Sequence, residues 1–186
     1  GWTQGVNTAF GGTDVADWSI GASTPSFATG PQAGDVTGGN FIYMEATSIW
    51  SPAGNGGQMT LNSECIDISA LACPELTFWY NMTENPGYLG YMGSLAVTVN
   101  GVAVWSYGPG LNTSSCNNGW CLAVVDLSAF ASETSATLSF IGTVGLNGYS
   151  DVSFDAVGVD ECQAFGCLDS TACNFDPTAS VSNGAC

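Results

Sequence analysis

The carboxylates are the only side chains of this sequence that carry charge at neutral pH. The 186 residues include 16 Asp and Glu but no Lys, Arg or His, which gives a formal net charge of −16. Ser–His nucleophiles, Schiff-base lysines and His-based zinc sites therefore have no residues within this chain to form them. Two-carboxylate glycoside hydrolysis is the common chemistry that remains, and no spacing of acids singles out such a pair.

The missing cations also exclude classes of partner. Without Lys or Arg there is no basic patch for the phosphates of nucleic acids or for an anionic membrane surface. The sequence has no apolar run of about 18 residues, the length that a membrane-spanning helix needs. Because no side-chain salt bridge can form, the acids must be solvated, hydrogen-bonded to backbone N–H groups or neutralised by dissolved cations. Calcium, which prefers oxygen ligands, is the cation that we expect.

The eight cysteines carry the second kind of chemistry. An even number at this density, without the paired CxxC spacing of zinc sites, predicts a disulfide framework in an oxidising, extracellular setting. Spacing alone does not fix the connectivity, although short separations favour local bridges. The pairs that we expect are Cys65–Cys73, Cys116–Cys121, Cys162–Cys173 and Cys167–Cys186.

Aromatic, amide and hydroxyl side chains offer two links to carbohydrate. Trp105 and Trp120 lie in or beside predicted loops, where aromatic rings stack on sugars or, more often, cover the ends of a core. Asn81 and Asn112 begin Asn-x-Ser/Thr sequons. Ser170 lies in an Asp-Ser-Thr triplet that resembles a short acceptor for bacterial O-glycosylation. Sugar stacking and glycan attachment are therefore candidate roles for these residues.

Short β-branched and aromatic segments between turn signals must position these groups. Hydrophobic residues make up 45% of the chain, enough for a core, and long helical periodicity is nearly absent. This pattern predicts an all-β sandwich or barrel. Asn100-Gly101 between two alternating segments predicts a type I′ hairpin. The strands that we expect span 41–45, 58–62, 75–82, 94–99, 102–106, 122–126, 136–142 and 152–159.

The composition changes near residue 160. Residues 161–186 hold four of the cysteines among Asp, Asn, Pro and Ser, with little apolar content. Such a segment cannot bury a core and needs disulfides to fold. We therefore expect a sandwich over 1–160 and a small disulfide-stapled module over 161–186. Its oxygen-bearing residues either bind a second calcium ion or form turns with their own backbone, which is the favoured interpretation; they are Asp169, Asn174, Asp176 and Asn183.

An ordered series of motifs resembles the MAM domain of large secreted bacterial surface proteins. The matching segments are Asp14-Val-Ala-Asp17-Trp18, Gly34-Asp35, Tyr43-Met44-Glu45-Ala46, Leu76-Thr-Phe-Trp-Tyr80, Val125-Asp126-Leu127 and Asp151-Val-Ser-Phe-Asp155. The resemblance covers roughly residues 2–160. It implies a jelly-roll antiparallel β-sandwich that serves adhesion or recognition outside the cell and is not an enzyme.

MAM domains usually begin with a strand that ends in Phe-Glu just before a Trp-Thr-Gln like Trp2-Thr3-Gln4. The resemblance therefore implies a further strand upstream of Gly1. A longer polypeptide could supply it, or a neighbouring copy could donate one by strand addition.

The resemblance also implies a cation site. Asp35, Glu45 and Asp155 match positions at which MAM domains gather acids around a bound cation, and Asp151 is a candidate extra ligand. Three carboxylates without a basic partner repel one another unless a divalent cation lies between them. We therefore expect calcium at these residues.

The last segment, from Gly166-Cys167 through Cys173-Asn-Phe-Asp-Pro177 to Cys186, resembles a short Cys-bracketed repeat of proteins exported by type IX secretion. The sequence thus predicts a non-catalytic extracellular adhesion or structural module, a repeating unit or subunit of a surface adhesin or fibre. Its partners would be copies of itself or neighbouring repeats, reached in some cases by strand exchange. A carbohydrate-binding module of a larger secreted protein is the alternative.

Overall fold

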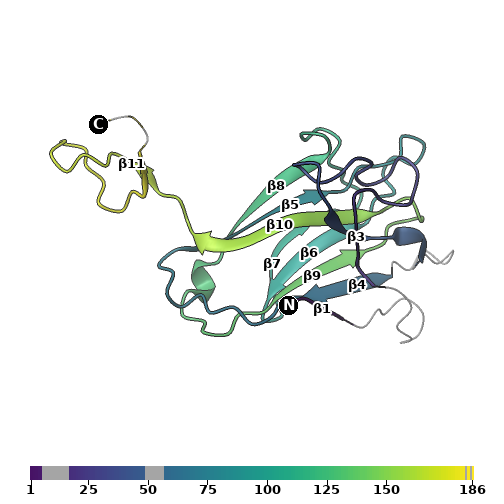
Figure 1. Ribbon diagram of the computed structural model, residues 1–186, viewed down its shortest axis with the longest axis horizontal. Helices are drawn as coiled ribbons and strands as arrows, with labels where there is room; N and C mark the ends of the chain where they lie inside the picture. The colour runs from purple at the N-terminus through teal and green to yellow at the C-terminus, as the bar shows by residue number, and fades with distance from the viewer. Residues whose placement is uncertain (6–16, 49–56, 183, 185) are drawn as a thin grey trace.

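The computed structural model describes residues 1–5, 17–48, 57–182, 184 and 186. Among these, ten strands form two five-stranded antiparallel sheets that pack face to face (Figure 1). The first sheet has the order β1 (Thr3–Gln4), β4 (Gln58–Asn62), β9 (Leu138–Thr143), β6 (Ser94–Val99) and β7 (Val102–Tyr107). The second has the order β2 (Ser19–Gly21), β3 (Phe41–Met44), β10 (Val152–Glu161), β5 (Pro74–Asn81) and β8 (Trp120–Asp126).

This is the predicted jelly-roll sandwich. All eight expected strands are present, with ends that differ by at most two residues from the predicted ones. The short edge strands β1 and β2 were not predicted. Two 3-10 turns follow β3 and β8, over Ala46–Ser48 and Ser128–Phe130. No helix among the described residues is long and apolar enough to cross a membrane.

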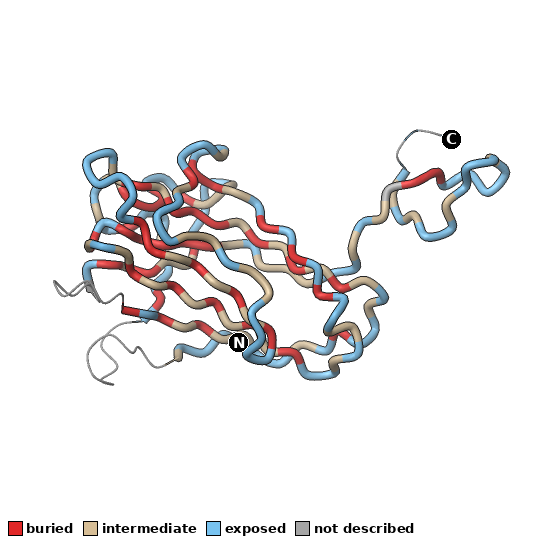
Figure 2. Tube along the Cα trace, turned by 180° about the vertical axis from the view of Figure 1, so that it is seen from behind, coloured by how far each residue is buried: buried red, intermediate tan, exposed pale blue. Residues whose placement is uncertain are grey.

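The core lies between the sheets and follows the period-two alternation of the strands. Along β5, Leu76, Phe78 and Tyr80 point inward and are buried. At the centre, the rings of Phe140 and Phe154 stack 4.1 Å apart, and neither side chain is exposed. Figure 2 shows buried residues along the strands of the sandwich. Close packing of large side chains therefore joins the two sheets.

The Asn100-Gly101 hairpin is confirmed. These two residues connect β6 to β7, with φ values of 50° and 79°. Positive φ at both central positions is what a type I′ turn requires, and Asn and Gly adopt it most readily. The Asn100 Oδ1 atom also accepts a hydrogen bond of 2.9 Å from the Thr137 N–H group. The turn thus fixes the register of the β6–β7 edge.

Two of the four expected disulfides are present, and the other two predictions are wrong. Cys116–Cys121 and Cys167–Cys186 form, but Cys73 pairs with Cys162, with Cα atoms 5.3 Å apart. The reason is strand register: β10 runs antiparallel to β5 and places Glu161 opposite Pro74, so the next residues meet. Cys65 and Cys173 are left as exposed thiols. Proximity along the chain was therefore a misleading guide.

The segment after β10 extends away from the sandwich (Figures 1 and 2). It contains a parallel pair of two-residue strands, β11 (Phe165–Gly166) and β12 (Val181–Ser182). Asp169 Oδ1 accepts hydrogen bonds from the Thr171 N–H and hydroxyl groups, and Asp176 Oδ1 accepts the same pair from Thr178. The two acids therefore form turns, as the favoured interpretation expected. Asn183 lies outside the described residues, as do Asp14–Ala16 of the MAM-like motif.

Candidate functional site

The four predicted metal ligands flank or occupy β3 and β10, and the fold divides them into two pairs. Val152 pairs with Met44, so the adjoining Asp151 and Glu45 lie opposite each other just beyond the strand ends. Asp155 is four residues farther along β10, about 13 Å away at the usual strand rise. The predicted cluster of Asp35, Glu45 and Asp155 around one ion is therefore wrong. Within the described residues, no three acids or cysteines lie together as a metal-binding group.

The first pair contains a buried carboxyl group. Asp151 has no exposed surface, and its Oδ1 atom accepts a hydrogen bond of 2.8 Å from the Ala46 N–H group. Its Oδ2 atom has no hydrogen-bond partner among the described residues. Burial, together with the negative charge of Glu45 nearby, raises the pKa of Asp151 to about 8. This site therefore favours either a proton or a cation on Asp151.

Glu45 is held by its own neighbours. Its Oε1 atom accepts hydrogen bonds from the Ser26 hydroxyl at 2.8 Å and from the Thr47 N–H group at 3.2 Å. The loop before β3 and the 3-10 turn after it thus orient this carboxylate beside Asp151. The arrangement gathers oxygen atoms from three segments of the chain.

The second pair lies on the outer face of β10. Asp35 Oδ1 accepts hydrogen bonds from Gly39 N–H at 2.9 Å and from Thr37 N–H at 2.6 Å. With the Thr37 hydroxyl, these bonds lower the pKa of Asp35 to about 2. Partial burial raises the pKa of Asp155, and hydrogen bonding to the Asp35 carboxylate adds to the effect. Carboxyl groups in hydrogen-bond contact are closer than the about 5–9.5 Å of glycosidase pairs.

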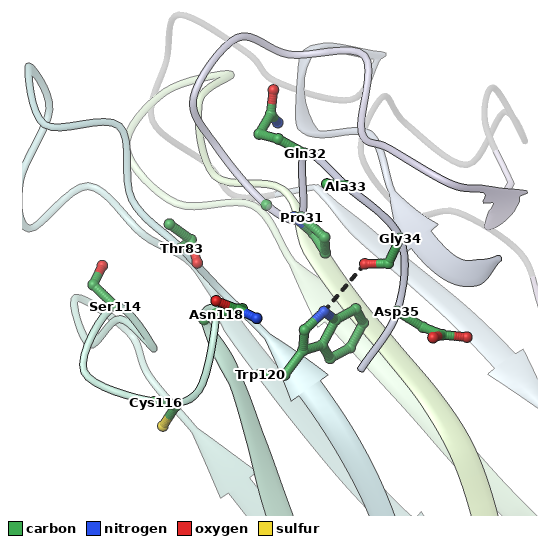
Figure 3. A pocket seen from close by; sticks show the side chains of 12 residues that line it. Pro31, Gln32, Ala33, Gly34, Asp35, Thr83, Ser114, Cys116, Asn118 and Trp120 are labelled. Atoms are coloured by element: carbon green, nitrogen blue, oxygen red, sulfur yellow. Dashed lines mark hydrogen bonds between the residues drawn. The ribbon is translucent and has the colours of Figure 1, made fainter. Parts of the chain in front are cut away.

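A pocket of about 670 Å³ opens beside Asp35 (Figure 3). The loops that line it are at the end of the sandwich opposite the C-terminal module (Figure 1). Three segments surround it. They are the loop after β2, Thr83 just after the end of β5, and the loop that leads into β8 and is closed by the Cys116–Cys121 bridge. Its lining comprises Gly30, Pro31, Gln32, Ala33, Gly34, Asp35, Thr83, Ser114, Cys116, Asn118, Gly119 and Trp120.

The walls of this pocket are fixed by contacts between the three segments. The Trp120 indole N–H group donates a hydrogen bond of 3.3 Å to the Gly34 carbonyl oxygen. The Gly30 N–H group donates one of 3.0 Å to the Thr83 carbonyl oxygen. Gly119 has a φ of 79°, and a Cβ atom there would lie 2.3 Å from Thr83 Oγ1, so only Gly fits. The pocket is therefore preformed.

The structure does not support Trp105 and Trp120 as an open sugar-stacking surface. Trp105 packs edge-on against Phe78 and Tyr80, with ring centroids 5.0 and 4.9 Å away. Trp120 is only 2% exposed. Trp105 instead packs against the core, the alternative considered for such aromatics, whereas Trp120 is covered by Phe41 and by the loop after β2. The exposed loop rings are others: Tyr88 stacks on Tyr149 at 4.7 Å, and both are partly exposed.

The three candidate glycan acceptors differ in accessibility. Asn81 is 1% exposed and its Oδ1 atom accepts a hydrogen bond from Thr83 N–H, so it is unsuitable in the folded protein. The Asn112 amide donates a hydrogen bond of 2.8 Å to Glu84 Oε2. Ser170 lies exposed in the C-terminal module.

The pocket residues Thr83, Ser114 and Asn118 were not predicted from the sequence. A usable signal was present, because Asn118-Gly119 is a turn dipeptide enclosed by Cys116 and Cys121. A short covalent ring with a tight turn presents fixed polar groups. What no local pattern indicated is that the loop after β2 folds back over Trp120.

Comparisons with known proteins support the fold. No family model matches the chain, and no curated protein matches it. Two solved structures of cleaved adhesin domains of Lys-gingipain from Porphyromonas gingivalis W83 are similar, each over 87% of this chain with a TM-score of 0.52. The K1 domain is 16% identical with 90% of its chain covered, and the K3 domain is 11% identical with 91% covered. At these identities the likeness shows that the chain has the jelly-roll sandwich found in those adhesin domains.

Proposed function

We propose that this chain is a non-catalytic extracellular module of a surface adhesin or fibre, stabilised by calcium and disulfide bonds. The observation that carries the proposal is the preformed pocket, whose lining in the described part of the chain brings hydroxyl and amide groups together. Such a lining can hold a polar ligand by hydrogen bonds. The three disulfides are typical of an oxidising, extracellular environment.

The shape of the chain supports the same role. The pocket loops and the C-terminal module lie at opposite ends of the sandwich (Figure 1). A module attached to its neighbours through residues 161–186 would therefore present its loops outward. The resemblance of this segment to repeats of type IX-secreted proteins supports a place at the bacterial surface.

Adhesion can be tested with beads that carry the purified protein in a flow chamber. We expect retention under shear on surfaces coated with the same protein, with glycans, or with both. Beads coated with albumin provide the background. Retention no greater than that background on every surface would contradict the proposed function.

Self-association is the part of this proposal that the sheet edges support. Among the described residues, β7 and β8 each pair with a strand on one side only, which leaves a row of backbone groups open on each. Val102 on β7 and Val124 on β8 are more than half exposed. Open edges of this kind accept a strand from another chain. We expect light scattering after size-exclusion chromatography to show concentration-dependent oligomers, and a strict monomer at high concentration would contradict it.

Calcium binding is proposed at Glu45 and Asp151. A buried carboxylate with an open oxygen, next to a second carboxylate and without any cationic side chain in the chain, is a costly arrangement unless a cation neutralises it. Oxygen-only ligands of this type suit Ca²⁺. Asp35 and Asp155 form a more exposed second pair with the same donor chemistry.

Calcium is expected to raise the thermal stability. When free calcium is at 100 times the Kd, its binding to a site that exists only in the folded state adds about 2.7 kcal/mol to the free energy of unfolding. For a chain of this size that corresponds to about 5–11 °C in Tm. Differential scanning calorimetry with calcium and with EDTA measures the shift. Asp151→Asn should remove it, whereas Asp160→Asn, an exposed acid on the same strand, should keep it. An identical Tm in both buffers would contradict the proposal.

A further inference from the structure

We propose that the pocket of about 670 Å³ beside Trp120 binds an uncharged oligosaccharide. This inference rests on the proposed role in adhesion and names its ligand class. The volume lies in the usual range for small-molecule sites. The site differs from an open aromatic surface, because Trp120, the one aromatic residue of its described lining, is almost fully buried.

The first argument is unused hydrogen-bonding capacity. Thr83 Oγ1, Ser114 Oγ and the Asn118 side-chain amide all line the pocket, and none of them has a hydrogen-bond partner in the described part of the chain. Figure 3 shows the three side chains together on one side of the pocket. Hydroxyl and amide groups both donate and accept. A ligand rich in hydroxyl groups, which also donate and accept, matches this set.

The second argument is the two-sided lining. Opposite the three polar side chains lie Pro31, Ala33 and Gly34, with Trp120 between the two sides (Figure 3). A sugar ring has an apolar face of C–H groups and a rim of hydroxyl groups. The pocket therefore offers an apolar surface for the first and polar partners for the second. Gln32 contributes less to ligand binding, because its amide nitrogen already donates hydrogen bonds to Thr24 Oγ1 and to two backbone carbonyl oxygens.

The third argument is charge. The Asp35 carboxyl group lines the pocket, where it accepts hydrogen bonds from the Thr37 and Gly39 N–H groups. The chain offers no Lys, Arg or His to pair with an anion, and its formal charge is −16. Phosphorylated, sulfated and uronic-acid ligands would therefore be repelled. An uncharged saccharide has no such penalty.

The fourth argument is preorganisation. The Cys116–Cys121 bridge closes the loop that contains Asn118 and Gly119, and these two residues adopt the positive φ values of a tight turn. Asn81 holds this loop through its side-chain amide, which donates to the Asn118 carbonyl oxygen at 3.5 Å. Walls that are fixed before binding reduce the entropy lost when a ligand is ordered.

The test is a binding screen of the full chain, with calcium present, against neutral, sulfated and uronic-acid oligosaccharides, followed by calorimetry on the best neutral binder. We expect Thr83→Val and Ser114→Ala each to weaken binding about 3- to 10-fold, the effect of one lost hydrogen bond. Thr98→Val makes the same change on the outer face of β6 in the other sheet and should leave the affinity unchanged. Circular dichroism and Tm check that each variant is folded.

Three outcomes would overturn the proposal. The first is that no neutral saccharide binds. The second is that the double variant of Thr83 and Ser114 binds as tightly as the unchanged chain, and the third is that charged glycans bind equally well. If bead retention on protein-coated surfaces persists in any of these cases, the adhesion role stands while the pocket assignment fails. Loss of retention on every surface would instead reject the adhesion role itself.

Discussion

Replacing Cys73 and Cys162 together by Ala is expected to lower the free energy of unfolding by about 3–5 kcal/mol. The bridge joins residues 89 positions apart, so it restricts a long loop of the unfolded chain. It also ties the start of β5 to the end of β10, two neighbouring inner strands of the second sheet. Urea denaturation followed by tryptophan fluorescence measures the loss.

A matched control comes from the other bridge of the sandwich. Cys116 and Cys121 are only 5 positions apart, so the same double replacement should cost about 2 kcal/mol less. Cys65→Ala removes a thiol that forms no bridge. Combining it with each double replacement excludes disulfide exchange with Cys65 as a cause of the measured loss. Equal losses for the long and short bridges would show that loop length does not determine the stabilisation.

Phe154→Ala is expected to destabilise the sandwich by about 3–5 kcal/mol, the range for a buried aromatic residue cut to Ala. Phe154 is fully buried, stacks on Phe140 at 4.1 Å and contacts the Trp18 ring at 5.1 Å. The change would therefore leave a cavity where the two sheets meet. The corresponding fall in Tm is about 6–20 °C, which calorimetry can measure.

Phe27→Ala is the matched control, because this ring is 81% exposed in a loop. Its loss should change the free energy of unfolding by about 0.5 kcal/mol or less. A Phe154→Ala variant that unfolds within about 1 kcal/mol of the unchanged chain would mean that the interior refills, and that the stacked pair does not organise the core.

The strands were predictable because their signal is local. Alternation in Leu76–Tyr80 and the Asn100-Gly101 turn depend only on residues near one another, and both appear in the structure as expected. β1 and β2 were missed because strands of two and three residues are too short to show a period. Edge strands of this length depend on their neighbour for their conformation.

The disulfides and the acids were less predictable because they depend on register between distant strands. Cys162 meets Cys73 only because β10 pairs with β5 in one particular alignment. The same β10 separates Asp151 from Asp155 along its length, so acids expected around one ion form two pairs. Four residues of separation on a strand are about 13 Å, a distance that one calcium ion cannot bridge.

The pocket depended on loop conformation, which sequence patterns define least. Trp120 begins a strand and would stand on an open face if the loop after β2 did not cover it. Two hydrogen bonds hold the loop there: one from the Trp120 indole to the Gly34 carbonyl oxygen, and one from the Gly30 N–H group to the Thr83 carbonyl oxygen. Neither contact has a signature in the residues themselves.

The bridge at the base of the C-terminal module also determines how the domain would respond to tension. A pull between residues before Cys73 and residues after Cys162 passes through the covalent bond, because the bridge closes residues 73–162 into a ring. Strands β5 to β10 would then be excluded from extension, and of the described strands of the sandwich only β1 to β4 could peel away. A chain of such domains would lengthen in short steps and keep most of each sandwich folded under load.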